Sequence, residues 1–479
     1  MIDGLVLFAL VLSLLQATVG LTFLISSMQE KEKRATLFGF FQFLILLLPV
    51  FLIFFLDQKG FFDTPLGIAL LFLGLVAFGV SAFCLVRRSG ENEKALQGTQ
   101  GQIVGPVARH DERTIVFARN RSLRPGSEQY ASFYEEHPEY QTYDDKRREM
   151  GGALGHVGSI DKPGGDVNAA AAFAGITIPM HLAALSAVNP APFPLLKDRP
   201  AIRLTPEEAT RKVKGYARQI GADLVGIAEL SDLWVYSHRG EIFHENWEDW
   251  GREIHVSHPY AIVIAMEMDF EMVGSAPHTP TLFESMNNYS KGAFLSSQLA
   301  AFVANLGYSA TASHFRHYEL VLPPLAVDAG LGEVGRLGYL MTKEFGPRIR
   351  LAAVTTDLPM VPDRPVDIGV KDFCRICKKC AVCCPSQSIP LGDPWEVNGS
   401  VRWKLNEETC FAYWGKIGTD CNICMRVCPW SHARTPPHRL IVELVSRNRS
   451  ARRLFARMDD LFYGNKPRAK TGPEWTRFE

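Results

Sequence analysis

Near the C-terminus of this 479-residue chain stands the stretch Cys374-Arg-Ile-Cys377-Lys-Lys-Cys380-Ala-Val-Cys-Cys384-Pro385. A second group follows it, a lone Cys410 and then Cys421-x2-Cys424-x3-Cys428-Pro429. Nine of the ten cysteines lie between Cys374 and Cys428, whereas a disulfide framework distributes its cysteines through a small secreted domain. Thiols clustered at such short spacing indicate ligands for a soft metal centre.

The spacing is that of the bacterial ferredoxin motif, in which the last cysteine of each run serves the other cluster. We therefore predict two [4Fe–4S] clusters. The ligands of one are Cys374, Cys377, Cys380 and Cys428, and those of the other are Cys384, Cys410, Cys421 and Cys424. Cys383 remains as a small apolar residue, because its neighbour directly precedes the proline of the motif. Structural zinc is the alternative, but it does not explain why both runs end in Cys-Pro.

Length and composition point to a chain of several parts. A chain of 479 residues suggests two or three domains. The formal net charge is zero and the pI is about 7.2, which argues against an electrostatic nucleic-acid binder. Hydrophobic residues make up 47% of the sequence but are concentrated in the first 90 residues. The remainder is typical of a soluble protein.

Three apolar stretches open the chain, at residues 4–26, 37–56 and 66–86, and none contains a charged side chain. Each has roughly the 20 residues that a helix needs to cross a hydrocarbon core. A cleaved signal peptide is the alternative for the first stretch. The absence of Lys and Arg from Met1-Ile-Asp3 and the two further stretches argue against it. We predict a three-helix membrane anchor over residues 1–90.

The basic residues predict the orientation of these helices. No twin-arginine leader precedes an apolar run. The basic residues of the two loops on one side are Lys31, Lys33, Arg34, Arg87, Arg88 and Lys94, whereas the other side has only Lys59. Because basic loops stay in the cytoplasm, the sequence predicts a multi-pass protein of the inner (cytoplasmic) membrane. Its large soluble part would face the cytoplasm.

Regular structure is predicted to resume after a polar linker and an irregular arm over residues 91–200. The run Thr205-Pro-Glu-Glu208 is a capping box with proline at the first helical position, and the helix is expected to run to Ile220. Strands are predicted at 223–228, 261–265 and 351–355, and a second helix at 290–306. Helices alternating with short buried strands indicate an α/β or α+β core.

The order of several segments between residues 200 and 435 resembles the corrinoid-dependent reductive dehalogenases, and the match continues through both cysteine motifs. The segments are Tyr260-Ala-Ile-Val263, Glu267-Met-Asp269, Tyr289-Ser-Lys291, Leu306-Gly-Tyr308, Ala326-Val-Asp-Ala-Gly-Leu-Gly-Glu333, Gly346-Pro-Arg-Ile-Arg-Leu351 and Thr356-Asp-Leu-Pro359.

The resemblance implies an α+β chain with a nitroreductase-like, cobalamin-binding catalytic core and a ferredoxin-like domain. The core would span residues 201–365, the two-cluster domain 366–435 and a C-terminal extension 436–479. The cobalamin would bind base-off, which is compatible with the absence of a D-x-H-x-x-G sequence. The residues assigned to cobalamin contacts are Gly330, Leu331, Gly332, Glu333, Thr356 and Asp357.

The same resemblance implies which residues act in catalysis. Tyr289 matches the tyrosine that donates the proton, and Arg350 the basic residue that steadies its anion, with Arg348 as the alternative if the alignment is shifted by two. A nearby cation favours the phenolate form of a tyrosine. Many relatives have an asparagine where this chain has His317, which is a substrate-site donor, a proton relay or a surface histidine. Without the resemblance, Tyr289 is an ordinary aromatic residue at the start of a helix.

The expected reaction is reductive removal of halide from an organohalide, for example a haloaromatic such as a bromophenol. Electrons would come from a quinol, a ferredoxin or a flavoprotein, and no nucleic acid is expected as a partner. One alternative is an epoxyqueuosine reductase-like enzyme, against which the apolar stretches and the neutral charge argue. Another is a membrane-bound ferredoxin-type electron carrier, which would hold eight irons and no corrinoid.

Overall fold

The computed structural model describes residues 2–150, 165–242 and 247–477, and its contacts divide the chain into two compact units. The first unit comprises Met1–Gly90, Asp372–Cys377 and His432–Pro467. The second comprises Glu91–Lys371, Lys378–Ser431 and Arg468–Glu479. Each unit is therefore assembled from segments far apart in sequence, and most of the predicted C-terminal extension belongs with the N-terminal helices.

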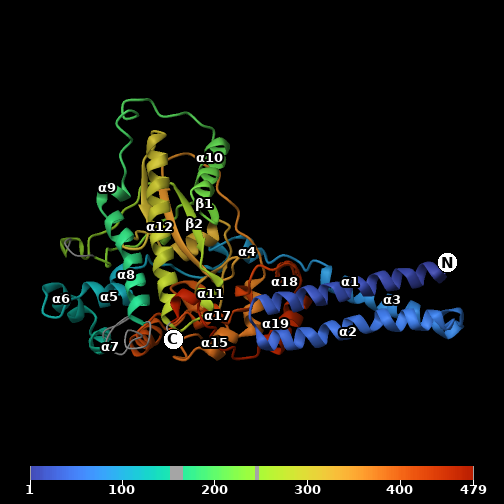
Figure 1. Ribbon diagram of the computed structural model, residues 1–479. Coiled ribbons are helices and arrows are strands. Elements are labelled where there is room, and N and C mark those ends of the chain that lie inside the picture. The colour runs from blue at the N-terminus through green and yellow to red at the C-terminus, as the bar shows by residue number, and fades with distance from the viewer. Residues whose placement is uncertain (1, 151–164, 243–246, 478–479) are drawn as a thin grey trace. The chain divides into compact units, whose positions relative to one another are not determined.

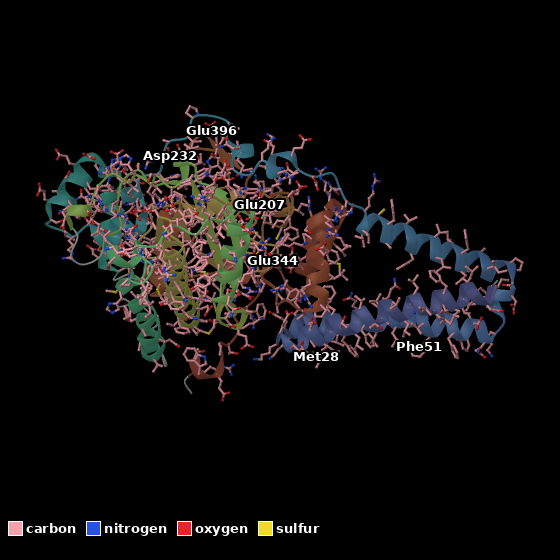
Figure 2. All side chains as sticks on the ribbon, turned by 90° about the horizontal axis from the view of Figure 1, so that it is seen from above. Met28, Phe51, Glu207, Asp232, Glu344 and Glu396 are labelled. Atoms are coloured by element: carbon pink, nitrogen blue, oxygen red, sulfur yellow. The ribbon has the colours of Figure 1, made fainter. Side chains whose placement is uncertain are left out.

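Three long apolar helices form the start of the first unit, in agreement with the predicted stretches. They are α1 (Ile2–Gln29), α2 (Lys33–Gln58) and α3 (Pro65–Val86), and all three are long and apolar enough to cross a membrane. Many of their large side chains are exposed, among them Met28 (60%) and Phe51 (63%), which are labelled in Figure 2. Exposed apolar surface on this scale is typical of helices that associate with a membrane.

Two C-terminal helices complete the first unit, α18 (Pro436–Arg447) and α19 (Arg449–Tyr463), beside the ends of α1 and α2 (Figure 1). Arg34 donates from Nε to the Leu461 carbonyl at 3.0 Å. Asn448 donates from Nδ2 to the Cys84 carbonyl at 2.8 Å. The rest of this unit is the cysteine-bearing part of α14 (Val370–Cys377).

A four-stranded sheet forms the centre of the second unit. Its order is β1 (Leu224–Glu229), β2 (Tyr260–Glu267), β6 (Ile349–Thr356) and β3 (Ala310–Ser313), and every pairing is antiparallel. All three strands predicted from the sequence are present: β1 is shifted by one residue, and β2 and β6 are each three residues longer than predicted. The core is thus of the α+β type.

The sheet is buried on both faces because its central strands alternate two sets of apolar side chains. Ile262 and Ile264 of β2 face one layer, and Ala261, Val263 and Ala265 face the other. The second layer includes α13 (Leu322–Asp328). Burial on both faces explains why these strands are nearly continuous apolar runs in the sequence.

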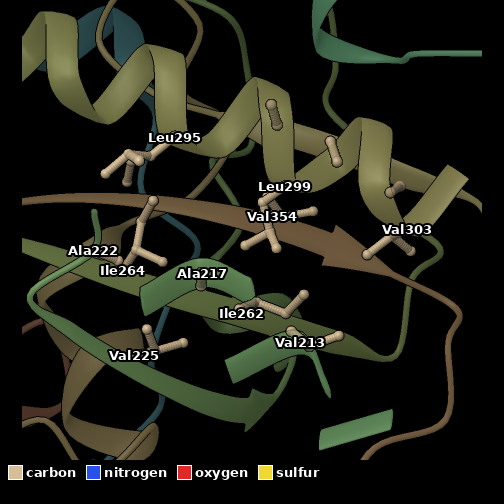
Figure 3. Packing of buried hydrophobic residues seen from close by; sticks show 14 of the residues in the cluster. Val213, Ala217, Ala222, Val225, Ile262, Ile264, Leu295, Leu299, Val303 and Val354 are labelled. Atoms are coloured by element: carbon tan, nitrogen blue, oxygen red, sulfur yellow. The ribbon is translucent and has the colours of Figure 1, made fainter. Parts of the chain in front are cut away.

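Helices α10 (Pro206–Gln219) and α12 (Thr279–Asn305) cover the first face. Figure 3 shows Leu295, Leu299 and Val303 pointing from α12 toward Val354 of the sheet. The predicted capping box of α10 is confirmed: Thr205 accepts from the Glu208 amide, and the Glu208 carboxylate accepts from the Thr205 amide.

The prediction that α12 starts near Ser290 is wrong by eleven residues. The helix begins at Thr279, with Pro280 in its first turn. Its first turns bury polar side chains, among them Glu284, Ser285 and Asn288, in place of an apolar stripe. A search for apolar periodicity therefore does not detect this half of the helix.

The arm, expected to be irregular, contains helices. They are α4 (Glu93–Leu96), α5 (Val116–Ser122), α6 (Glu128–Glu136), α7 (Pro138–Glu149), α8 (Gly165–Leu182) and α9 (Leu185–Val188). The helices α5 and α7 are joined by a buried ionic network. Arg119 donates from Nε to Asp144 at 2.7 Å, Arg147 donates from Nη1 to the same carboxylate at 2.9 Å, and Arg147 also pairs with Glu408 at 2.6 Å. Buried charged contacts leave no hydrophobic pattern in the sequence, so apolar periodicity does not predict α5 and α7.

The remaining elements of the described chain are short. They are α11 (Phe270–Gly274), β4 (Glu333–Val334), β5 (Leu340–Met341), α15 (Lys379–Cys383), β7 (Trp395–Val397), β8 (Ser400–Arg402), α16 (Glu407–Ile417) and α17 (Ile423–Arg426), with single 3-10 turns at Phe61–Asp63, Gln100–Gln102, Glu112–Thr114, Asp232–Trp234, Trp247–Asp249, Pro429–Ser431 and Glu474–Thr476.

Replacing Asp144 by alanine should destabilise the second unit by about 3–5 kcal/mol, because Arg119 and Arg147 would remain buried with one carboxylate fewer. The midpoint of thermal unfolding of the full chain measures this loss. Asp145→Ala is the matched control: its ion pair with Arg148 is partly exposed and should contribute below about 1 kcal/mol. Equal effects of the two substitutions would contradict the structural role of the network.

Candidate active site

The register of the sheet aims Arg350 at helix α12. Arg350, Ala352 and Val354 are alternate residues of β6, so their side chains lie on the same face of the sheet. Ala352 and Val354 pack against α12 on this face. Gly292 lets the helix come close, since a Cβ there would lie 2.8 Å from the Met266 side chain. Tyr289 lies one turn before Gly292, so the sheet and the helix bring the two predicted catalytic residues together.

Tyr289 and Arg350 line one cavity of about 220 Å³ in the second unit. The Arg350 guanidinium lies 5.4 Å from the centroid of the Tyr289 ring. The phenol ring also stacks on Phe315, with centroids 4.2 Å apart and planes 16° from parallel. The ring is thus in contact with both a cation and an aromatic face. Further lining residues, mostly aromatic or charged, are Glu112, Phe117, Arg121, Tyr236, Glu241, Met286, Tyr318 and Trp414.

A buried hydrogen-bond network holds the Arg350 guanidinium in place. Arg350 donates from Nη2 to Ser285 Oγ at 2.9 Å, and Ser285 donates from Oγ to Asp420 at 2.6 Å. Asn422 donates to the same Asp420 oxygen at 2.8 Å. Burial opposes charge on Arg350, but the nearby Tyr289 and Asp420 raise its pKa above the ordinary value. Arg350 is therefore a fixed cation at the cavity wall.

The opposite part of the cavity also carries charge. Arg121 of α5 pairs with Glu241, and Arg316 lies 3.8 Å from the same carboxylate. Burial, and then the charge of Arg121, lower the pKa of Arg316 to about 9. Burial raises the pKa of Glu112 to about 7, although two backbone amides donate to it. Sequence reasoning missed these residues because they come from segments without any motif.

A second cavity of about 260 Å³ adjoins the first, since Ile115 and Tyr236 line both. Its walls combine apolar side chains with groups that hydrogen-bond amides. The apolar ones include Val107, Trp234, Pro323, Pro324 and Val334, and the polar ones include Gln102, His110, Asn398, Ser400 and Lys404. Such a lining is typical of a site for a large, partly apolar ligand with polar substituents.

The six residues assigned to cobalamin contacts do not line these two cavities, and each has internal contacts. A Cβ on Gly330 would lie 2.5 Å from the Arg364 carbonyl, and one on Gly332 2.1 Å from the Met341 carbonyl. Glu333 accepts from the Ile368 and Val370 amides, and Asp357 accepts from the Ser309 amide. Thr356 donates to the Ser309 carbonyl, and Leu331 packs in the second hydrophobic layer. Glycine here serves close packing of the backbone, and cofactor contact stays a prediction.

The structure separates the two other candidates from Tyr289. His317 is buried, and its Nε2 lies 3.6 Å from Glu319, outside the lining of the Tyr289 cavity. Arg348 donates from Nε to the Ser431 carbonyl at 3.0 Å and pairs with Glu267 at 3.1 Å. Of the two arginines proposed from the sequence, Arg350 is the one at the phenol.

The second predicted set of cysteines lies together in the second unit. Burial, and then the neighbouring thiols Cys421 and Cys384, raise the pKa of Cys410 to about 12. Burial raises the pKa of Cys424 further, and the charges of Cys421 and Cys410 add to this. Ser388 donates its amide to Cys384 Sγ at 3.3 Å. Burial thus disfavours the free thiolates of Cys410, Cys421 and Cys424, as suits thiols that bind cationic iron.

The first predicted set draws on both units: Cys374 and Cys377 belong to the first, and Cys380 and Cys428 to the second. Its assembly into one site stays a prediction. Cys383 ends α15 and is partly buried. The tenth cysteine, Cys84, is exposed on α3.

Curated relatives are reductive dehalogenases. The tetrachloroethene reductive dehalogenase of Desulfitobacterium hafniense is 34% identical over 275 residues, which are 48% of this chain and 50% of that protein. The enzyme of the same name from Sulfurospirillum multivorans is 33% identical over 302 residues, which are 57% of this chain and 60% of that protein. The chain thus spans about half the length of the curated relatives it matches. No family model matches the chain.

An epoxyqueuosine reductase from Cyclobacterium marinum is 34% identical, but over only 117 residues, which are 23% of this chain and 37% of that protein. Similarity to that class of enzyme is therefore partial.

Solved structures extend the match. The catabolic reductive dehalogenase NpRdhA in complex with 3-bromo-4-hydroxybenzoic acid matches with a TM-score of 0.60 at 26% identity, over 79% of this chain and 49% of that one. A reductive dehalogenase structure that suggests a mechanism for B12-dependent dehalogenation matches with the same TM-score at 25% identity, over the same shares. The resemblance seen in the sequence is thus confirmed over most of the chain. Over the parts that are matched, the sequence and the fold of this chain are therefore similar to those of reductive dehalogenases.

Proposed function

We propose that this chain is a membrane-anchored, corrinoid-dependent reductive dehalogenase that replaces a halogen on an organic substrate by hydrogen. One observation carries the proposal: Tyr289, a proton donor, and Arg350, a fixed cation, share a cavity that adjoins a second, amide-binding cavity. An electron carrier without a substrate has no need of this arrangement. The similarity to reductive dehalogenases supports the same reading.

The resident cofactors of the proposed enzyme are base-off cobalamin and two [4Fe–4S] clusters, within a nitroreductase-like core (201–365) and a ferredoxin-like domain (366–435). The lining of the second cavity suits part of a corrinoid, because its apolar side chains can pack on the ring and its polar side chains can hydrogen-bond the amide substituents. Bound there, a corrinoid supplies the electrons that break the carbon–halogen bond. The clusters would be held by the two sets of four cysteines predicted above.

The residues of the cavity supply the proton that replaces the halogen. Stacking on Phe315 fixes the Tyr289 ring, so that its O–H group is aimed at one place. That O–H donates its proton to the carbon from which halide leaves, and Arg350 stabilises the resulting phenolate. The aromatic walls exclude water, which strengthens this interaction. In balance, the substrate gains two electrons and one proton and loses a halide ion.

The lining suggests a haloaromatic substrate. A cavity of about 220 Å³ walled by Phe117, Phe315, Tyr318 and Trp414 suits one aromatic ring. The related structure of NpRdhA contains 3-bromo-4-hydroxybenzoic acid, a compound of this kind. A bromophenol remains the simplest representative.

The three apolar helices support a membrane anchor, and the basic residues of their loops support a cytoplasmic catalytic part in the inner membrane. Fusing a periplasmically active reporter after residue 88 tests the orientation. The reporter should be inactive, and an active one would place the catalytic part on the opposite side.

Halide release by the purified full chain tests the proposed function. The chain, reconstituted with cobalamin and iron–sulfur clusters and given reduced methyl viologen, should release bromide from bromophenols. Tetrachloroethene, the substrate named for the curated relatives, is the comparison substrate. Eight irons without corrinoid binding and without halide release would refute the proposal in favour of an electron carrier.

Replacing Ser285 by alanine should lower the turnover number about tenfold with little change in KM, because Arg350 loses the hydrogen bond that holds it at Tyr289. Steady-state halide release measures the effect. Thr281→Ala is the matched control on the same helix, since Thr281 Oγ1 accepts from Asn422 but does not contact Arg350. In a Tyr289→Phe background the Ser285 substitution should have no further effect, and an additive loss would contradict the proposed role.

A further inference from the structure

The first unit contains a buried group of ionisable side chains that the proposed reaction does not use. Its centre is Glu30, His432 and His438, each of which has a ligand-type atom within 4.8 Å of those of the other two. Glu30 and His438 are buried, with 6% and 5% exposure, and Glu30 directly follows the last residue of α1. The group therefore lies where a membrane-spanning helix ends.

These side chains form two hydrogen-bonded groups, one around His438 and one that joins His432 to Asp459. His438 Nδ1 lies 3.1 Å from Glu30 and shares a hydrogen bond with Thr435 Oγ1 at 2.7 Å. His438 Nε2 shares a hydrogen bond with the Tyr463 hydroxyl at 2.9 Å. His432 Nε2 and Asp459 are 2.6 Å apart. Protons can move along such hydrogen bonds between neutral and charged groups.

The arrangement of the rings argues against a metal ion. The His432 and His438 rings stack with centroids 4.8 Å apart and planes 23° from parallel. Lone pairs of imidazole nitrogens lie in the ring plane, so two nearly parallel rings do not converge on one ion. Both ring nitrogens of His438 also have partners already. Burial lowers the pKa of His438, although Glu30 opposes this shift, so the imidazole is a neutral base.

Aromatic side chains surround this group on the side of the helices. The Phe23 ring lies 5.9 Å from His438 and 5.1 Å from Phe462, which packs on Phe38. Ala35 and Met458 belong to the same cluster. An aromatic wall beside a polar, proton-accepting group at the end of membrane helices suits a ring with ionisable hydroxyls that arrives from the bilayer.

The same unit also contains part of the predicted electron path. The segment Asp372–Cys377, which carries two predicted cluster ligands, groups with the membrane helices. Arg452 of α19 donates to Asp372 at 2.9 Å, which fixes this segment to the C-terminal helices. In sequence, His432 follows the predicted ligand Cys428 by only four residues.

We propose that Glu30, His432, His438 and Tyr463 form the site at which a membrane quinol is oxidised. Both O–H bonds of the quinol break: one proton passes to His438 and the other to Glu30, and the product is a quinone. The two electrons pass singly, one to each predicted cluster. The inference rests on the proposed function to the extent that these clusters are the electron acceptors.

Anaerobic reduction of the clusters by duroquinol tests the site, with the full chain in lipid nanodiscs and visible absorbance and electron paramagnetic resonance as readouts. Glu30→Gln and His438→Gln should slow this reduction tenfold or more. Glu32→Gln, in the same loop, should leave it unchanged. Reduction by methyl viologen and the iron content should be the same in all four proteins, which shows that the variants are folded.

Duroquinol reduction of both variants at the wild-type rate would overturn the inference, and so would a wild-type protein that duroquinol does not reduce. A stoichiometric metal ion beyond the cluster iron, lost in His438→Gln, would also overturn it in favour of a metal site. Failure of the proposed function would give a different result. Duroquinol would reduce the clusters, but the protein would release no halide when methyl viologen is the electron donor.

Discussion

Replacing Tyr289 by phenylalanine should lower halide release by about 10²–10⁴-fold while leaving both kinds of cofactor bound. Phenylalanine keeps the ring that stacks on Phe315 and faces Arg350, so the cavity retains its shape. Only the O–H group is removed, and with it the proton for the carbon from which the halide leaves. Iron content, the corrinoid spectrum and halide release with reduced methyl viologen measure the three parts of this prediction.

Tyr216→Phe is the control for the loss of a tyrosine hydroxyl elsewhere in the second unit. Tyr216 stacks on Phe302 in the hydrophobic core, away from the cavity residues, and should tolerate the substitution with full activity. Halide release by Tyr289→Phe at the wild-type rate would refute the tyrosine as the acid. The proton would then have to come from another group, and Tyr236 and Tyr318 are candidates of the same chemistry in the cavity lining.

The second large effect is expected at the cysteines. Cys384→Ser should remove one cluster, lowering the iron content by about half and reducing halide release below detection. The Ser388 amide and the Ser386 hydroxyl lie 3.3 Å and 3.5 Å from Cys384 Sγ, as suits a cluster thiolate. Iron analysis and electron paramagnetic resonance of the reduced protein measure the loss.

Its neighbour provides the control. Cys383→Ser changes an adjacent cysteine that the motif leaves without a role, so the iron content and the activity should stay as in the wild type. If instead Cys383→Ser loses the cluster and Cys384→Ser keeps it, the predicted crossing of ligands between the two runs is wrong at this position. The two variants thus show whether Cys384 itself binds the cluster, or whether any substitution in this segment causes the loss of iron.

The core could be predicted from sequence where its elements carry strong local signals. The capping box at Thr205, the apolar strands and the stripe through Leu295 and Leu299 all specify their structure locally. The cysteine spacing specifies its chemistry in the same way. Tyr289 and Arg350 were found only through the resemblance, because a lone tyrosine and a lone arginine have no motif of their own.

The rest of the site depends on tertiary structure. Ser285 and Asp420 meet Arg350 from segments 135 residues apart, and no local pattern links them. The first turns of α12 and the paired helices α5 and α7 are stabilised by buried polar and charged groups, which periodicity does not register. Close packing against the chain's own backbone accounts for glycine at 330 and 332, and contact with a cofactor there stays a prediction.

The discontinuity of the first unit has a consequence for how the protein is made. Helices α1 to α3 leave the ribosome first, yet residues His432–Pro467, which complete their unit, are synthesised after nearly the whole catalytic part. The early helices must therefore wait in the bilayer while the intervening domain folds. A chain interrupted before residue 432 would leave Phe23 without Phe462 and Arg34 without its carbonyl partner. The first unit is thus completed only late in synthesis, after most of the second unit has been made.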